Sequence, residues 1–368
     1  PGGSVGLFSG YANAWYASLG SWPLPETMAP SPVVDNFIDL PYKDNSVRAI
    51  FTFGDKLYQW YANMNKAREW WTSLDFIVFC DIYHAESANF ADLILPACTK
   101  FESIDDIGGL RQADGFFRLQ EKVLDPLFES KPDFWIEHEI AKLFGVENYL
   151  PQSPEEYVQA LLDNPEEPFL EGVTLEKIRE NQSVLPFSNC EGIRVGFSNK
   201  VFSTGSGKIE VYYPSLVSFD QQLPNYEEPI EAYASNELRN TYPLQLHGSR
   251  PKYFIHNQFQ NATWIKQYMD SRVEMNKADA AARELFEGDL VEIFNDRGKC
   301  STKVVINNSI RPGSVQMYEG NWTKYMESGN VQALANNTPN PRGYALWIGP
   351  VTPFNDTLVE VRKVGDAS

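Results

Sequence analysis

Residues 74–96 have the sequence LDFIVFCDIYHAESANFADLILP, and they decide the fold class of the first half of the chain. The run from 74 to 80 is almost wholly apolar, which is typical of a β-strand buried on both faces of a sheet. Asp81 stands at its C-terminal end. A second apolar run at 93–95 is stopped by Pro96, so we expect a second strand there.

The residues before this stretch show the same alternation of strand and helix signals. Residues 47–53 (VRAIFTF) predict a strand that ends at Gly54. Residues 63–71 predict a helix, because apolar side chains recur on one helical face. Strand, helix, strand, short helix and strand in this order favour a parallel α/β sheet.

A connecting region separates this part from the C-terminal half. Residues 132–145 (PDFWIEHEIAKLFG) predict an amphipathic helix with Pro near its start and Gly as its C-cap. Residues 151–235 are rich in Pro and Glu. Within them, 202–212 (FSTGSGKIEVY) predict a hairpin with glycines at the turn.

The last third of the chain has the texture of an all-β domain, because short apolar runs alternate with Gly and Asn turns. We expect strands at 242–247, 290–295, 300–306, 315–318 and 358–361, which together favour a small barrel. The organisation predicted for the whole chain is a tail of a preceding module at 1–45, an α/β domain at 46–225 with a connecting excursion at about 150–225, and a β-barrel domain at 235–368.

Composition excludes several classes of function. The net charge of −18 disfavours nucleic acid and anionic lipid as partners, because both need clustered Lys and Arg. No apolar run approaches the length of a membrane helix, so we expect no direct membrane insertion. The four cysteines do not cluster, so no zinc or iron–sulfur site is encoded locally. Cys80 and Cys98 lie in apolar runs and are expected to be buried thiols, although a disulfide stays open.

Polar residues at strand ends are the first candidates for a ligand site. In an open α/β sheet, ligands bind at the carboxyl ends of the strands. Gly54 and Asp81 stand at two such ends, and a glycine lets a ligand approach the backbone closely. The alternative is that Asp81 only caps a loop or a helix.

Four motifs follow one another along the chain and carry a resemblance. They are ADLILP at 91–96, SGKIE at 206–210, LHGSRPKYFIHNQFQN at 246–261 and EMNKADAAARELFEGDLVEIFNDRGKC at 274–300. In this order and spacing they resemble the C-terminal part of the molybdopterin oxidoreductases of the dimethyl-sulfoxide-reductase family. The resemblance covers about residues 45–365, with a diffuse interval at 150–200. It implies a Rossmann-like parallel-sheet domain followed by an all-β barrel of the double-psi-like type.

The resemblance implies a set of cofactor-binding residues. Asp81 would accept hydrogen bonds from a guanine edge, with Gly54 and Asp92 nearby, although Asp92 alone is equally a capping residue of a buried strand. The polar loop after 246 would hold pyrophosphate and pterin, because Arg offers a planar fork and His a ring donor. Its members are His247, Gly248, Ser249, Arg250, His256 and Gln258. Asn337 and Asn355 would reach the pterin. The alternatives are a polar surface loop and turn-forming asparagines.

The function implied by the resemblance is that of an oxidoreductase that depends on molybdopterin guanine dinucleotide with Mo or W. The reaction would transfer an oxygen atom, sulfur or two electrons to or from a small substrate, in a prokaryotic-type enzyme of the cytoplasm or periplasm. We nominate no catalytic residue, no metal ligand and no iron–sulfur cluster on this chain. The chain begins Pro-Gly-Gly without Met, so we expect a missing N-terminal part of the same enzyme to supply the metal ligand.

The sequence leaves two alternative functions open. The first alternative is a cofactor-free relative that serves as a scaffold in an electron-transfer complex. The second is a stand-alone module that binds some other ligand. In the main interpretation, an iron–sulfur electron-transfer subunit is a further expected partner.

Overall fold

The computed structural model describes residues 47–54, 61–104, 107–108, 116–164, 170–186, 200–202, 204–269, 271–340, 342 and 352–365. The predicted tail at 1–45 lies outside them. By internal contacts the chain forms two compact units, which interleave along the sequence. Of the described residues, the first takes Cys80–Tyr83 and Leu95–Val211, and the second takes those from 47 to 79, His84–Ile94 and Tyr212–Ser368. The predicted domain borders stay a prediction.

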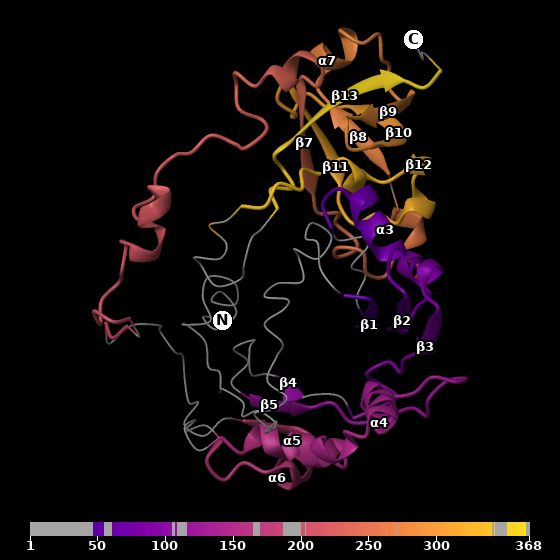
Figure 1. The fold of residues 1–368 in the computed structure, drawn as a ribbon, viewed down its shortest axis with the longest axis vertical. Helices are drawn as coiled ribbons and strands as arrows, with labels where there is room; N and C mark the ends of the chain where they lie inside the picture. The colour runs from indigo at the N-terminus through magenta and orange to yellow at the C-terminus, as the bar shows by residue number, and fades with distance from the viewer. Residues whose placement is uncertain are drawn as a thin grey trace. The chain divides into compact units, whose positions relative to one another are not determined.

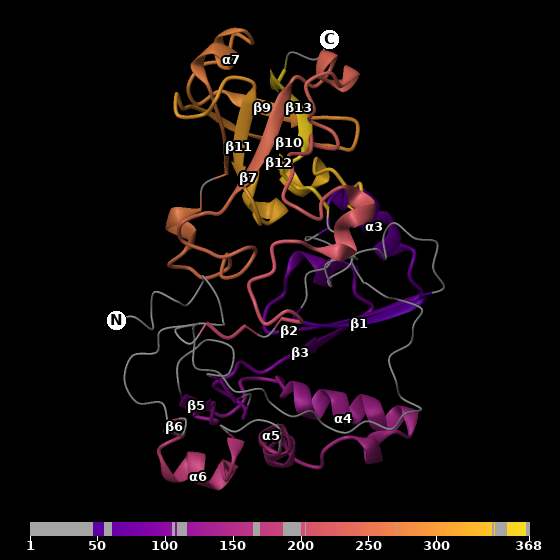
Figure 2. The same ribbon diagram turned by 90° about the vertical axis from the view of Figure 1, so that its left-hand side faces the viewer.

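The predicted parallel sheet is present, with strand order β1-β2-β3 (Figure 2). Its strands are β1 (Ala49–Phe53), β2 (Phe76–Asp81) and β3 (Leu93–Pro96). Backbone hydrogen bonds advance in the same direction along β2 and β3, because the Asp92 N–H donates to the Ile77 carbonyl and the Ala97 N–H donates to the Asp81 carbonyl. On the other side, the Phe76 N–H donates to the Arg48 carbonyl just before β1. All residues of β2 after the first are buried, as its apolar run predicts.

Helix α3 (Met64–Thr72) and the 3-10 helix η4 (Glu86–Phe90) connect these strands. Asn63 caps α3, because its side chain accepts from the backbone N–H of Lys66. The apolar face of α3 is buried as the periodicity predicts, and its Trp71 is fully covered. This face packs in one cluster with Ile77 of β2 and with Ala333 from the C-terminal half of the same unit.

The first unit contains helices and a small antiparallel sheet. The helices are α4 (Asp133–Phe144), η5 (Glu147–Tyr149), α5 (Pro154–Leu162) and α6 (Leu175–Glu180). The sheet has the order β4 (Ile107–Gly108), β5 (Phe116–Leu119) and β6 (Val184–Pro186). Helix α4 begins after Pro132 and ends at Gly145, whose φ is 68°, as the sequence predicts. The sequence analysis missed the small sheet, because its strands are only two to four residues long.

The predicted hairpin at 202–212 is wrong. Among its described residues, a turn closes from the Gly207 N–H to the Thr204 carbonyl, but no strands pair on either side of it. Ile209 and Val211 are 69% and 65% exposed, so this segment has no sheet face against which to bury its apolar side chains. Further on, the connecting region forms the 3-10 helices η7 (Pro214–Phe219) and η8 (Glu237–Asn240).

The second unit contains the predicted barrel, which closes through six strands in the order β10-β8-β11-β7-β13-β9 and back to β10 (Figure 1). The strands are β7 (Leu244–Ser249), β8 (Arg272–Met275), β9 (Leu290–Phe294), β10 (Lys299–Ile306), β11 (Ser314–Tyr318) and β13 (Thr357–Lys363). Two pairs, β10 with β8 and β11 with β7, run parallel, and the other pairs run antiparallel. This mixed pairing agrees with the double-psi-like expectation.

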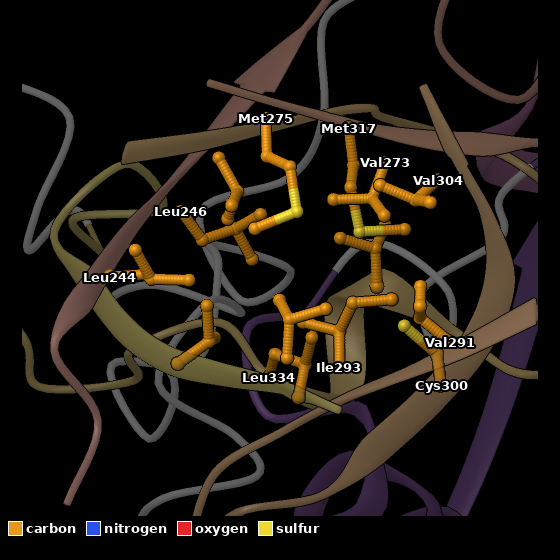
Figure 3. Close-up of a cluster of buried hydrophobic side chains, with 14 of the residues drawn as sticks. Leu244, Leu246, Val273, Met275, Val291, Ile293, Cys300, Val304, Met317 and Leu334 are labelled. Carbon is orange, nitrogen blue, oxygen red and sulfur yellow. The ribbon is translucent and has the colours of Figure 1, made fainter. Parts of the chain in front are cut away.

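The barrel interior is filled by apolar side chains from all six strands, which point towards one another in Figure 3. Leu244, Val273, Ile293 and Val304 are at most 1% exposed. Close packing of this kind leaves no room for a ligand inside the barrel, so a site belongs at its ends. Cys300 lies in the same core, and burial raises the pKa of its thiol to about 12.

Some barrel elements differ from the sequence-based expectation. Strand β8 and strand β12 (Ser328–Gly329), which pairs with β10, are not among the strands expected from the sequence. Helix α7 (Lys277–Ala281) begins after Asn276, whose side chain caps it. Three further 3-10 helices complete the unit: η9 (Lys266–Tyr268), η10 (Thr323–Tyr325) and η11 (Val331–Ala333).

The segment that leads into the barrel is tied to it by buried carboxylates. The carboxylate of Asp356 accepts the backbone N–H groups of three successive residues, 230–232, at 2.5–3.0 Å. The Glu231 carboxylate in turn accepts hydrogen bonds from both terminal guanidinium nitrogens of Arg297, at 2.7 and 2.9 Å. Charge-assisted bonds of this type are stronger than neutral ones, so this segment is fixed on the barrel.

The structure shows how far the cysteines are buried and whether any described helix could span a membrane. Cys80 is buried, but Cys98 is only partly buried, so the expectation of a core thiol is wrong for Cys98 because it lies just beyond the sheet strand. Neither is in a disulfide, and Cys190 lies outside the described residues. Among the residues described, none of the helices combines the length and apolar character that crossing a bilayer requires.

Candidate functional site

Three chain segments converge at one end of the barrel. β7 and β11 run parallel with Tyr318 opposite Ser249, so both strands end at the same level. β13 runs antiparallel to β7 and begins beside them. Asn355, two residues before this start, accepts the Gly248 backbone N–H at 2.7 Å through its side-chain oxygen. Two of the predicted residues, far apart in sequence, are therefore in direct contact.

The long loop after β7 folds back onto the segment after β11. The buried Gln260 donates to the carbonyl of Gly320 and accepts the Trp322 backbone N–H at 2.9 Å. The Trp322 ring N–H donates to the carbonyl of Asn257, also at 2.9 Å. Gly320 has φ 79°, and a side chain there would meet the His256 carbonyl oxygen at 2.1 Å. This position therefore requires glycine for two separate reasons.

Opposite charges meet where the two segments touch. The Glu319 carboxylate lies 3.4 Å from the Arg250 guanidinium and 3.6 Å from the His256 ring nitrogen. Neither contact has the geometry of a hydrogen bond, and the oxygen concerned is buried without one. At this distance the carboxylate and the Arg250 guanidinium attract each other, so Arg250 is drawn towards the end of β11.

Buried amide groups without hydrogen-bond partners gather in the same loops. Asn257 is 2% exposed, and neither its side-chain oxygen nor its nitrogen has a partner. The side-chain oxygens of Asn261 and Asn321 and the side-chain nitrogen of Asn336 are in the same state. Buried polar atoms are almost always paired, so an unpaired group of them calls for a ligand or ordered water. Donors and acceptors of this kind fit a heterocycle with a polar edge, such as a pterin.

Asn337 lies where α3 meets the barrel. Its side-chain oxygen accepts from the Asn63 side chain at 3.2 Å. The neighbouring Asn336 backbone N–H donates to the Thr357 hydroxyl at 2.9 Å, next to the start of β13. The structure therefore places Asn336 and Asn355 near the same end of β13, and Asn337 with them.

Three other predicted residues of the barrel differ in their surroundings. His247 alternates with the core residues of β7, so its ring lies on the outer face, where burial lowers its pKa. Ser249 ends β7, and its hydroxyl lies 3.4 Å from the Met317 carbonyl. Gln258 is exposed within the loop. Ser249 and Gln258 are thus beside the convergence of loops, whereas His247 belongs to the strand wall.

The predicted residues of the parallel sheet have local structural roles. The Asp92 carboxylate accepts the Ile77 backbone N–H at 2.8 Å, and the Asp92 backbone N–H donates to the Ile77 carbonyl. Asp81 is buried and accepts the Tyr83 N–H at 3.0 Å. Gly54 follows β1 with φ 61°, which favours glycine. Asp81 belongs to the first unit and the barrel to the second, and each is described on its own.

Sequence analysis missed Glu319, Asn321 and the buried amides of the loop. The signal was present in residues 318–322 (YEGNW), where a strand ends at a carboxylate and a glycine. It could not be used, because the parallel pairing of β11 with β7 is not visible in the local sequence. Within the ranges that the structure describes, no three His, Cys, Asp or Glu side chains are grouped as metal ligands.

Comparison with known families matches both halves of this architecture. Residues 34–143 match the family model described as molybdopterin oxidoreductase. Residues 244–343, which include the loop after β7 and the segment after β11, match the model described as molydopterin dinucleotide binding domain. The two matched segments occur in the order that the sequence motifs predict.

Relatives agree with these matches. The chain is 29% identical to the dimethyl sulfoxide reductase DmsA of Escherichia coli, over 79% of this chain and 38% of the relative. It is 30% identical to the probable oxidoreductase YyaE of Bacillus subtilis, over 85% of this chain and 44% of the relative. This chain thus spans about two fifths of the length of these curated relatives.

A solved structure supports the fold. Acetylene hydratase from Pelobacter acetylenicus superimposes with a TM-score of 0.69 and 19% identity, over 88% of this chain and 45% of that protein. The likeness concerns the fold alone, whereas the family models concern the sequence. Together with the convergent loops at the barrel end, these matches show that the chain belongs to the molybdopterin oxidoreductases of the dimethyl-sulfoxide-reductase family and carries their dinucleotide-binding barrel.

Proposed function

We propose that this chain is the cofactor-binding portion of a molybdopterin-guanine-dinucleotide-dependent oxidoreductase that acts on a small substrate. The observation that carries this proposal is the group of buried, unpaired amides at Asn257, Asn261 and Asn321. They lie within the segment that matches the dinucleotide-binding family model. Polar groups left unpaired in a protein interior are costly, so a structure retains them where a ligand completes them.

The residues of the barrel end have distinct tasks in this proposal. The backbone at Gly248 and the side chain of Asn355 fix the start of the loop, through their 2.7 Å hydrogen bond. Arg250 and His256 supply donors, and the asparagine amides supply both donors and acceptors to the ring system. The bound cofactor supplies the redox chemistry, whereas the protein binds and orients it.

Cofactor content tests the role of the loop. We expect Arg250→Ala in the full-length enzyme to lower the molybdenum and guanine nucleotide content per polypeptide, because it removes a guanidinium from the loop. Arg311→Ala is the matched control: Arg311 is also exposed but precedes β11, at the opposite end of that strand from Glu319. Metal analysis and nucleotide release by acid give the content. Equal content in both variants and the parent would reject this role of Arg250.

Cofactor content and a thermal-shift measurement separate the proposal from its two rivals. A cofactor-free scaffold would hold neither molybdenum nor guanine nucleotide in the full-length protein, yet would co-purify with its complex. A stand-alone module would show no rise in melting temperature with guanine nucleotide but a rise with an unrelated ligand. Either result would overturn the proposed function.

We further propose that the working enzyme includes polypeptide beyond this chain. The curated relatives are more than twice as long as the segment matched here, which leaves room for such polypeptide, and we assign the metal ligand of the working enzyme to it. An iron–sulfur electron-transfer subunit is the partner that a redox enzyme of this type would need. Co-purification of the full-length protein, followed by iron and sulfide analysis of each subunit, tests this partner.

A further inference from the structure

Glu319 is the charged residue of the barrel end to which the sequence motifs assign no role. It follows β11 directly, and its backbone N–H donates to the Ser249 carbonyl at 2.9 Å, so its main chain is fixed beside the end of β7. Its side chain extends over Gly248, since a side chain built at Gly248 would lie 4.0 Å from the Glu319 Cβ and Oε2 atoms. The carboxylate is therefore held within the candidate site.

The Arg250 guanidinium and the His256 ring both approach this one carboxylate. Arg250 and His256 are six positions apart, and 71% and 49% of their side-chain surface is exposed. Exposed side chains of this length sample many rotamers, and ordering them on binding costs free energy. His256 also has φ 50°, a backbone conformation that a non-glycine residue adopts only when its surroundings hold it.

We propose that Glu319 is a positioning residue that holds Arg250 and His256 ready for the cofactor before it binds. This inference rests on the proposed function and deepens it. At 3.4 and 3.6 Å the two contacts are not closed hydrogen bonds, so the buried Oε1 atom retains its acceptor capacity. A guanidinium has five N–H donors, so Arg250 can contact Glu319 and still donate to a ligand.

Paired substitutions test this role in the full-length enzyme. We expect Glu319→Ala to lower the affinity of the apoprotein for the isolated molybdenum cofactor about twofold to fivefold, the range that loss of an exposed charge contact allows. If Glu319 acts through Arg250, combining Glu319→Ala with Arg250→Ala should add little to the effect of Arg250→Ala alone. Glu319→Gln retains an acceptor and should restore part of the affinity.

Glu292→Ala is the matched control. Glu292 also contacts two cations, Lys299 at 3.0 Å and Arg362 at 2.5 Å, but on the strands of the barrel wall. We expect it to change the melting temperature while leaving cofactor affinity unchanged, and Glu319→Ala to do the reverse. Additive effects of Glu319 and Arg250, or equal affinity losses in Glu292→Ala and Glu319→Ala, would overturn the inference. An absence of cofactor from the parent enzyme would instead overturn the proposed function.

Discussion

At the scale of single residues, the candidate site is defined by buried polar side-chain atoms that have no hydrogen-bond partner in the protein. The amide of Asn257 is buried and unpaired, whereas the amide of the nearby Gln260 is paired at both ends. The two side chains have the same chemistry but opposite roles, because Gln260 fastens the loop and Asn257 remains available. A sequence shows both as polar loop residues and cannot distinguish them.

Gly320 gives a prediction at this scale. We expect Gly320→Ala to lower the free energy of unfolding by about 3 kcal/mol, from the cost of a positive φ and from the steric clash with the His256 carbonyl. Gly288→Ala is the control, because Gly288 has φ 82° but open space around it, so only about 1 kcal/mol is expected. Urea unfolding measures both, and equal losses would show that the close approach to His256 costs nothing.

At the scale of elements, local patterns predicted what depends on local sequence. The buried run of β2, the capped helix α4 and five of the barrel strands follow from periodicity and from turn residues. The hairpin at 202–212 failed because a turn sequence does not guarantee a partner surface. β8 was missed because its four residues, RVEM, alternate charged with apolar side chains too briefly to form a pattern.

The same limit applies to the candidate site. Gly248, Arg250 and Asn355 could be predicted because they lie in recognisable motifs. Glu319 could not, since its proximity to Arg250 depends on a parallel pairing between strands about 65 residues apart.

The strap at residues 230–232 gives a prediction for an element. We expect Asp356→Asn to accelerate amide hydrogen exchange at these residues and to lower the free energy of unfolding by about 2 kcal/mol, because three N–H groups lose a charged acceptor. Asp296→Asn is the control, since Asp296 is exposed and makes only a long contact with Arg297, at 3.9 Å. Unchanged exchange at 230–232 would mean that Glu231 and Arg297 suffice to hold the strap.

At the scale of the whole molecule, the closed barrel should open as one cooperative unit. Cys300 reports on this, because it is fully buried in the core and its pKa is about 12. A pKa raised this far keeps the thiol protonated from pH 7 to pH 9, so a rise in pH within that window should not expose a thiolate.

We therefore expect a thiol-specific alkylating reagent to modify Cys300 only in urea concentrations that unfold the barrel. Cys98 is the internal control, because it is partly exposed and should react in the native protein. Peptide mass spectrometry assigns the label to each cysteine. Modification of Cys300 well below the unfolding midpoint would show that the barrel opens locally.

The position of β13 in the barrel has a consequence for how the protein is made. Among the described strands it is the last to be synthesised, yet it fills the gap between β7 and β9, which are synthesised more than 60 residues earlier. Until then, both neighbours have unpaired backbone edges that could capture another nascent chain. The contact of Asn355 with Gly248 forms only after the segment that leads into β13 has been synthesised, so this end of the barrel is complete only once β13 has joined it.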